Sequence, residues 1–203
     1  MSFYEKRILP KMIHCACGMK PTMKQRAKVV PHAEGRVLEI GIGSGLNLSF
    51  YQKDKLTSLV GIDPSKETWE VNKNKRDDLD FKYIQTGAEN LPLEDQSFDT
   101  IVMTYTLCTI PDGIRALREM RRVLKPKGQL LFCEHGKAPD ASVLKWQNRI
   151  NPIWKRVGGG CYLNKDIPKL LEENGFQIQD LKTMYIPGPK FLSFNYWGNA
   201  TIK

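Results

Sequence analysis

The residues Val37-Leu38-Glu39-Ile40-Gly41-Ile42-Gly43-Ser44-Gly45-Leu46-Asn47 are the most informative stretch of this 203-residue sequence. The apolar side chains at its start predict a short buried strand. The three glycines that follow allow positive φ angles and let another group approach the bare main chain. We therefore expect a strand, a tight turn and then a helix, whose free N–H groups offer a place for a ligand.

The composition is that of an ordinary globular protein, with 41% hydrophobic and 26% charged residues. We expect a single domain, 1–203, made of an N-terminal helical cap (1–34) and a core (35–203). The longest runs without a charged residue, 100–111 and 191–202, each hold 12 residues. A bilayer span needs roughly 20 apolar residues, and the N-terminus lacks the apolar segment of a signal peptide. These features predict a cytoplasmic protein.

The five cysteines form an odd, scattered set, unlike the disulfide framework of a secreted protein. Cys15 and Cys17 lie beside His14, but no second pair follows at the spacing of a zinc finger. We therefore expect free thiols and no metal site.

The net charge of +9 is unevenly distributed, because eight basic residues and one acidic residue lie between Lys6 and Arg36. Three interpretations of this basic segment remain open, the first of which is a solvated face. The second is contact with an anionic membrane or substrate, since a helix here would carry an apolar stripe of Ile8, Leu9, Met12 and Ile13. The third, nucleic acid, is disfavoured because no recognisable binding module follows.

Strands are predicted at 37–40, 56–63, 81–85, 97–104, 129–134, 176–186 and 191–202, and helices at 3–17, 22–31, 46–51, 64–76, 111–124 and 166–174. An irregular region with helical pieces is expected up to about residue 156. This alternation predicts an α/β fold, a Rossmann-like, doubly wound, mostly parallel sheet of seven strands with an N-terminal helical cap. The short link at 187–189 makes the last two strands an antiparallel hairpin.

Two common phosphate-binding patterns do not fit the glycine turn. The dinucleotide pattern G-x-G-x-x-G needs a third glycine where Leu46 stands, and the P-loop pattern G-x-x-x-x-G-K-[ST] is absent from the sequence. The E-x-G-x-G-x-G form at 39–45 instead resembles motif I of the class I S-adenosylmethionine-dependent methyltransferases. Three further segments resemble this family in the same order: Asp63 at the end of the second strand, 88–92 followed by 97–99, and 118–128.

The resemblance implies S-adenosylmethionine as the cofactor and assigns its binding residues by position. Glu39 and the glycines would hold the methionine end, and the two carboxylate oxygens of Asp63 would bind the ribose hydroxyls. An alternative is that both acids only cap helices. Relatives often carry an acid where Gly87 stands, so this chain departs from the family at the adenine. The predicted set is Glu39, Gly41, Gly43, Gly45, Asp63, Pro64, Ser65, Ala88, Glu89, Thr104 and Tyr105.

Shorter motifs indicate the methyl acceptor. The residues at 104–107 lack the N-P-P-Y-like tetrad of enzymes that methylate nucleic-acid bases. Leu107-Cys108, Glu134-His135-Gly136 and the segments 146–147, 151–155 and 160–164 resemble the methyltransferase-like protein 7 group and its bacterial relatives. This resemblance implies a small-molecule thiol as the acceptor. The alternative is a phospholipid amine or a quinone-like lipid, which the basic cap would meet at an anionic membrane surface.

A thiol has a pKa near 8.5, so a weak base is sufficient to form the thiolate. His135 is the predicted catalytic base or orienter of the acceptor, and a purely structural hydrogen-bonding role is the alternative. The predicted acceptor pocket has an aromatic wall and two cysteines that pack without a covalent role: Trp146, Trp154, Tyr185, Cys108 and Cys161. The sequence does not indicate an oligomeric state.

Overall fold

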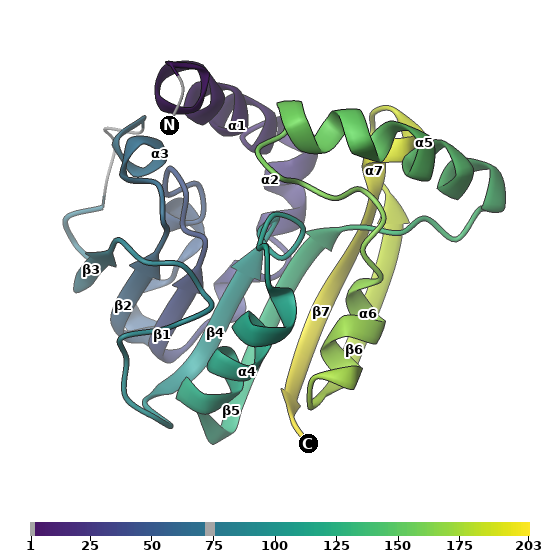
Figure 1. Ribbon diagram of the computed structural model, residues 1–203. Helices are drawn as coiled ribbons and strands as arrows, with labels where there is room; N and C mark the ends of the chain where they lie inside the picture. The colour runs from purple at the N-terminus through teal and green to yellow at the C-terminus, as the bar shows by residue number, and fades with distance from the viewer. Residues whose placement is uncertain (1–2, 72–75) are drawn as a thin grey trace.

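The computed structural model describes residues 3–71 and 76–203. Its centre is a seven-stranded sheet with the order β3-β2-β1-β4-β5-β7-β6 (Figure 1). Strands β1 to β5 are parallel and β7 is antiparallel to both of its neighbours, which confirms the predicted fold. The strands are β1 (Gly35–Ile40), β2 (Leu56–Ile62), β3 (Phe81–Ile84), β4 (Phe98–Thr104), β5 (Leu124–His135), β6 (Phe176–Tyr185) and β7 (Phe194–Ile202).

Helices flank the sheet, and α1 and α5 lie across the edge where the central parallel strands end (Figure 1). The α-helices are α1 (Leu9–Cys17), α2 (Lys20–Arg26), α3 (Lys66–Val71), α4 (Gly113–Val123), α5 (Ala141–Val157), α6 (Ile167–Glu173) and α7 (Lys190–Ser193). A π-helical turn η1 (Tyr4–Ile8) precedes them, and the 3-10 turns are η2 (Val30–His32), η3 (Leu48–Phe50) and η4 (Lys53–Lys55).

Successive residues of β1 point to opposite faces of the sheet. Leu38 and Ile40 belong to an apolar core that includes Leu117 and Met120 of α4. Val37 belongs to a second core, built with side chains from the N-terminal segment and α3. Both faces of the central strands are therefore buried, which explains why their sequences are almost continuously apolar.

The order of the strands reverses between β1 and β4. From β1 the chain moves outward through β2 and β3, and then returns to β4 on the other side of β1. Open α/β sheets bind ligands at such a point, outside the carboxyl ends of the strands. The glycine turn leaves β1 here, and the loop that begins at Tyr105 leaves β4 beside it.

The prediction of a helix at 46–51 is wrong, because only the short turn η3 follows the glycines. Asn47 and Tyr51, on either side of this turn, are buried and donate hydrogen bonds to the carboxylate of Glu39. These two anchors keep the backbone close to β1, so a regular helix does not form.

The region expected to be irregular up to residue 156 contains α5, a continuous helix with Pro152 inside it. Its buried side chains are polar rather than apolar. Gln147 accepts a hydrogen bond from Ala138 N at 2.9 Å, and Asn151 accepts one from Leu163 N at 3.0 Å. These bonds hold the helix in place. Its apolar residues recur at helical spacing at 146, 150, 153 and 157, a pattern that predicts a helix and that the prediction of an irregular region overlooked.

The other elements differ from their predicted bounds by a few residues. The helix expected at 22–31 is α2 followed by η2, and the link between β6 and β7 contains α7. The helix expected at 64–76 begins as α3, and its positions 72–75 lie outside the described residues. Within the described part of the chain, no helix has the length and apolarity that a membrane crossing requires.

We predict that Gly198→Ala destabilises the C-terminal hairpin. A Cβ at Gly198 would lie 1.9 Å from the carbonyl oxygen of Asp180, at an irregularity in the pairing of β6 with β7. Overpacking of this kind costs about 1–3 kcal/mol, which urea unfolding measures directly. Gly113→Ala is the control, because the atom nearest to its Cβ would be at 3.5 Å, an ordinary contact. Equal stability of the two variants would contradict the prediction.

Candidate active site

A cavity of about 800 Å³ lies at the carboxyl ends of the parallel strands. Residues that follow β1 to β4 form one side of it, and residues of α1 and α5 line the other side. Small-molecule sites have volumes of about 300–1,000 Å³, so the cavity can hold a cofactor together with a small acceptor. The predicted residues on its lining are Gly41, Gly43, Asp63, Pro64, Ser65, Ala88, Glu89, Thr104 and Tyr105.

The glycine turn has the positive φ angles that its sequence predicts, +65° at Gly41, +53° at Gly43 and +76° at Gly45. A Cβ at Gly41 would lie 2.3 Å from Thr106, so the loop after β4 packs directly on this glycine. A Cβ at Gly43 would meet nothing closer than 3.8 Å. The missing side chain of Gly43 therefore leaves bare main chain facing the cavity.

Asp63 lies directly after β2, and its carboxylate connects two turns. Its Oδ2 accepts a hydrogen bond from Gly43 N at 2.9 Å, and its Oδ1 accepts one from Ser65 N at 2.8 Å. Burial raises the pKa of Asp63, while these backbone donors lower it. Each carboxylate oxygen can accept a further hydrogen bond, so Asp63 can still bind a pair of ligand hydroxyls.

The loop after β3 brings the carboxylate of Glu89 beside Gly87. A Cβ at Gly87 would lie 2.7 Å from Oε2 of Glu89. The carboxylate of Glu89 therefore occupies the space beside Gly87 where a side chain would begin. Ala88 between them is buried.

Glu39 lies behind the cavity lining, in a buried polar network. Its carboxylate accepts hydrogen bonds from Asn47 Nδ2 at 2.9 Å and from the hydroxyl of Tyr51 at 2.8 Å. Asn47 also donates to Thr104 Oγ1 at 2.9 Å. The network thus joins the ends of β1 and β4, and Glu39 positions the residues that line the cavity.

Arg26, at the end of α2, completes this network and is a residue that the sequence did not single out. It is 5% exposed and donates to Asn47 Oδ1 at 2.9 Å and to Thr104 Oγ1 at 2.5 Å. Its Nε has no hydrogen-bond partner among the described residues, and the side chain lies on the cavity lining. A guanidinium on the lining of a cavity is suited to a carboxylate ligand. Its only sequence signal was membership of the basic segment.

Tyr105 has a left-handed backbone conformation, with φ +52°. Aromatic residues seldom adopt it, and such strain is concentrated at functional sites. The conformation is held by hydrogen bonds from Tyr105 N to Cys133 O at 2.8 Å and from its hydroxyl to Asn195 at 2.5 Å. The Arg26 guanidinium lies 5.1 Å from the centre of its ring. Tyr105 thereby connects the cavity to the C-terminal hairpin.

Glu134, near the end of β5, fixes the loop after β4. Its Oε1 accepts hydrogen bonds from Thr106 N at 2.7 Å and Leu107 N at 3.0 Å. Its Oε2 is buried without a hydrogen-bond partner among the residues that the structure describes. Burial raises the pKa of Glu134 to about 7, although the two backbone donors oppose this.

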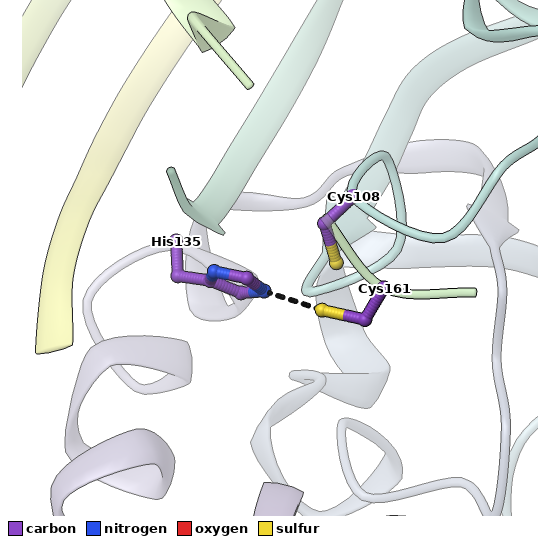
Figure 2. A group of neighbouring side chains, drawn as sticks. All are labelled: Cys108, His135 and Cys161. Atoms are coloured by element: carbon purple, nitrogen blue, oxygen red, sulfur yellow. Dashed lines mark hydrogen bonds between the residues drawn. The ribbon is translucent and has the colours of Figure 1, made fainter. Parts of the chain in front are cut away.

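His135 does not line the cavity but forms a cluster with Cys161 and Cys108 (Figure 2). A hydrogen bond of 3.2 Å joins His135 Nε2 to Cys161 Sγ. A hydrogen bond from Cys108, together with the neighbouring His135, lowers the pKa of Cys161 against the effect of burial. The residues adjacent in sequence, Thr109 and Gly160, do line the cavity, so the cluster lies just beneath its surface.

The structure does not place the three predicted pocket aromatics on the cavity lining. Trp146 is 58% exposed, because its neighbour Gln147 is the α5 residue that faces the protein interior. Trp154 is half-buried beside Gly158, and Tyr185 donates its hydroxyl hydrogen to Asp140. The expected aromatic wall is therefore replaced by aliphatic side chains, chiefly Leu9, Pro10, Ile13 and Ile110.

Helix α1 also brings two polar side chains to the cavity that were not predicted as site residues, His14 and Cys17. A hydrogen bond of 2.7 Å joins His14 Nδ1 to Ser44 Oγ in the glycine turn. The N-terminal helices are therefore part of the site.

The parallel sheet, the glycine turn and the acid after β2 define a nucleotide-cofactor enzyme of the methyltransferase class. Residues 38–132 match a family model described as a methyltransferase domain. A S-adenosylmethionine-dependent methyltransferase from Thermotoga maritima superimposes with a TM-score of 0.70 at 22% identity, over 100% of both chains. This similarity shows the fold.

Among methyltransferases, the chain is similar in sequence to thiol S-methyltransferases. The chain is 32% identical to the thiol S-methyltransferase TMT1B of Homo sapiens over 176 residues, 83% of this chain and 72% of that protein. It is 35% identical to TMT1B of Rattus norvegicus over 154 residues, which covers 73% of this chain but only 63% of the rat protein. The chain belongs to the class I S-adenosylmethionine-dependent methyltransferases, and its cofactor is S-adenosylmethionine.

We predict that the stability of the ligand-free protein decreases with pH because of Glu39. Burial raises the pKa of Glu39 from 4.5 to about 7, so the folded state holds this proton more tightly than the unfolded chain. The stabilisation of the folded state by the proton on Glu39 is complete below pH 4.5. It is lost as the pH rises through about 7. The shift corresponds to about 3 kcal/mol in the free energy of unfolding.

Urea unfolding at pH 4.5 and pH 8 measures this loss. Glu39→Gln keeps the shape of the side chain. In this variant, the decrease in the free energy of unfolding between pH 4.5 and pH 8 should be smaller by about 3 kcal/mol. The exposed Glu94→Gln serves as the control. An unchanged pH dependence in Glu39→Gln would refute the assignment.

Proposed function

We propose that this protein transfers the methyl group of S-adenosylmethionine to the sulfur of a small-molecule thiol. The observation that carries the proposal is the similarity to thiol S-methyltransferase TMT1B over 72% of the human protein. The aliphatic side chains of α1 on the cavity lining support it, because an apolar lining favours an organic acceptor.

The residues on the cavity fit each part of the cofactor. Arg26 supplies a buried cation on the cavity lining for the carboxylate. Asp63 retains free lone pairs for the two ribose hydroxyls. Glu89 places a carboxylate beside the bare Gly87, where it would accept a hydrogen bond from the adenine amino group. Gly43 leaves main chain open to close contact, with Pro64 and Ser65 nearby on the lining.

The methionine end would lie against Thr104 and Tyr105, which leave β4 on the cavity lining. Glu39 is set behind Asn47, so it would act on the cofactor ammonium through its field or through a water molecule rather than by direct contact. The buried network makes these positions rigid, and rigid placement of the reacting groups is the main contribution that a methyl transfer requires.

When bound, the cofactor supplies a methyl group already activated on a positively charged sulfur. The thiol loses its proton, a sulfur–carbon bond forms to the methyl group, and the bond from the methyl group to the cofactor sulfur breaks. A thiol with a pKa near 8.5 is already a few per cent ionised at neutral pH. The chain therefore has to align the thiolate and exclude water, which the aliphatic side chains of α1 do. Direct access of His135 to the acceptor is limited by Cys161.

We expect S-adenosylhomocysteine to form only when a thiol is added, as measured by mass spectrometry with a panel of alkyl and aryl thiols. Asp63→Ala should weaken cofactor binding by about 1.5–3 kcal/mol for each hydrogen bond lost, which calorimetry detects as at least a tenfold higher Kd. The exposed Asp54→Ala is the matched control. Cofactor binding without turnover of any thiol would reject the thiol acceptor.

A second candidate acceptor, a lipid, is favoured by one surface feature. Turn η1 contacts the end of α5 beside the cavity, since the Tyr4 hydroxyl donates to Val157 O at 2.7 Å. Trp146, Ile153 and Val157 are exposed and spaced along one face of α5. Helix α5 carries only basic charges, at 145, 149, 155 and 156. We name the exposed apolar residues of the N-terminal segment and α5, together with the basic residues of α5, the apolar–basic face. Its apolar residues are Phe3, Ile8, Met12, Trp146, Ile153 and Val157.

An anionic membrane is the partner that matches the apolar–basic face in charge and polarity. We expect the protein to float with vesicles that contain phosphatidylglycerol and not with phosphatidylcholine vesicles. Ile153→Glu should reduce binding about fivefold or more, because one charge near such a surface contributes about 1 kcal/mol. Leu181→Glu, at an exposed site on β6, is the control. Equal binding of the two variants would contradict the assignment, and the lipid acceptor would lose its support.

A further inference from the structure

Three side chains that could bind a metal ion converge at the ends of β4 and β5. The Sγ atoms of Cys108 and Cys161 and a ring nitrogen of His135 all lie within 4.8 Å of one another. Figure 2 shows the two sulfur atoms and the imidazole directed toward a common point. Both cysteines are buried, so this is an interior arrangement and not a surface coincidence.

The spacing is close to that of a tetrahedral zinc site. Zinc–sulfur and zinc–nitrogen bonds of about 2.3 and 2.0 Å place the two sulfurs about 3.8 Å apart and each sulfur about 3.5 Å from the nitrogen. The observed Nε2 to Sγ distance between His135 and Cys161 is 3.2 Å, and the third atom lies within 4.8 Å of both. Shifts of under about 1 Å would therefore complete the geometry.

The three side chains are held by bonds from several parts of the fold. Glu134 binds Leu107 N, next to Cys108, at 3.0 Å. Lys165 Nζ donates to Leu107 O at 2.7 Å and to Ile110 O at 3.0 Å. Tyr162 N donates to Cys108 O at 3.0 Å, which brings the backbone beside Cys161 onto the same loop. A site preformed in this way avoids the cost of ordering its ligands when the ion binds.

We propose that Cys108, His135 and Cys161 form a zinc site whose fourth coordination position opens toward the cavity and binds the acceptor thiol. Two thiolates and one imidazole are the ligands that zinc prefers, and three protein ligands with one open position are characteristic of catalytic zinc sites. Thr109 and Gly160, adjacent to the two cysteines, line the cavity. His135 is then a metal ligand rather than a base.

The role of the open position rests on the proposed thiol methylation, whereas the metal site does not. Zinc binding releases the protons of Cys108 and Cys161. Zinc then stabilises the acceptor as a thiolate, so that its proton passes to solvent before the sulfur attacks the methyl group. The cysteine spacing in the sequence predicted no metal site because these ligands come from three separate segments.

The first test measures metal binding in the full chain under reducing conditions, without cofactor or thiol. We expect about one zinc per chain by mass spectrometry of the metal, and a thiolate-to-metal charge-transfer band when cobalt replaces zinc. Cys161→Ser should weaken zinc binding by about 100-fold or more, since even indirect changes at metal sites cost 10- to 100-fold. His135→Ala should act similarly if it still folds. Cys15→Ser, an exposed cysteine on α1, is the matched control.

The absence of zinc, or equal zinc binding by Cys161→Ser and Cys15→Ser, would overturn the metal site. The second test adds a small alkyl thiol to the cobalt form. A change in the absorption band supports the open position, and an unchanged band overturns it. Zinc binding without turnover of any thiol would reject the proposed function and leave the metal site standing.

Discussion

A buried guanidinium holds the N-terminal segment on the edge of the sheet. Arg26 comes from α2, before the first strand, yet it donates hydrogen bonds to Asn47 after β1 and to Thr104 at the end of β4. Asn47 links Arg26 to the carboxyl group of Glu39 within the same network. Buried charges are tolerated when they are paired and hydrogen-bonded. The cavity exists because this network fixes the cap, the glycine turn and the loop after β4 relative to one another.

The sheet and the cofactor end of the site follow from local patterns in the sequence. The parallel strands are apolar on both faces, and the glycines at 41, 43 and 45 have the positive φ angles that only glycine adopts easily. Asp63 directly follows β2, as its position in the sequence indicates. These features depend on neighbours in the chain, so one sequence is sufficient to predict them.

The remaining features depend on contacts between distant segments. Helix α5 is held on the fold by polar contacts of Gln147 and Asn151 with residues outside the helix. The helix expected after Gly45 is absent because Asn47 and Tyr51 are drawn toward Glu39. Arg26 and the cluster of His135 with its two cysteines gain their significance only when the fold brings their segments together. The pattern of apolar and polar residues along the chain does not encode polar contacts between segments that are distant in the sequence.

The two ends of the cavity belong to different parts of the chain. The segment matched by the family model, 38–132, holds the glycine turn, Asp63 and Glu89. The aliphatic side chains of α1 and the lining residues at the end of α5 lie outside that segment. Exchange of the first 34 residues between relatives would therefore alter the aliphatic lining and Arg26, while the glycine turn, Asp63 and Glu89 would stay in the shared segment. Substrate range in such proteins can diversify through the cap alone, and similarity confined to the shared segment reports on the methyl donor and not on the acceptor.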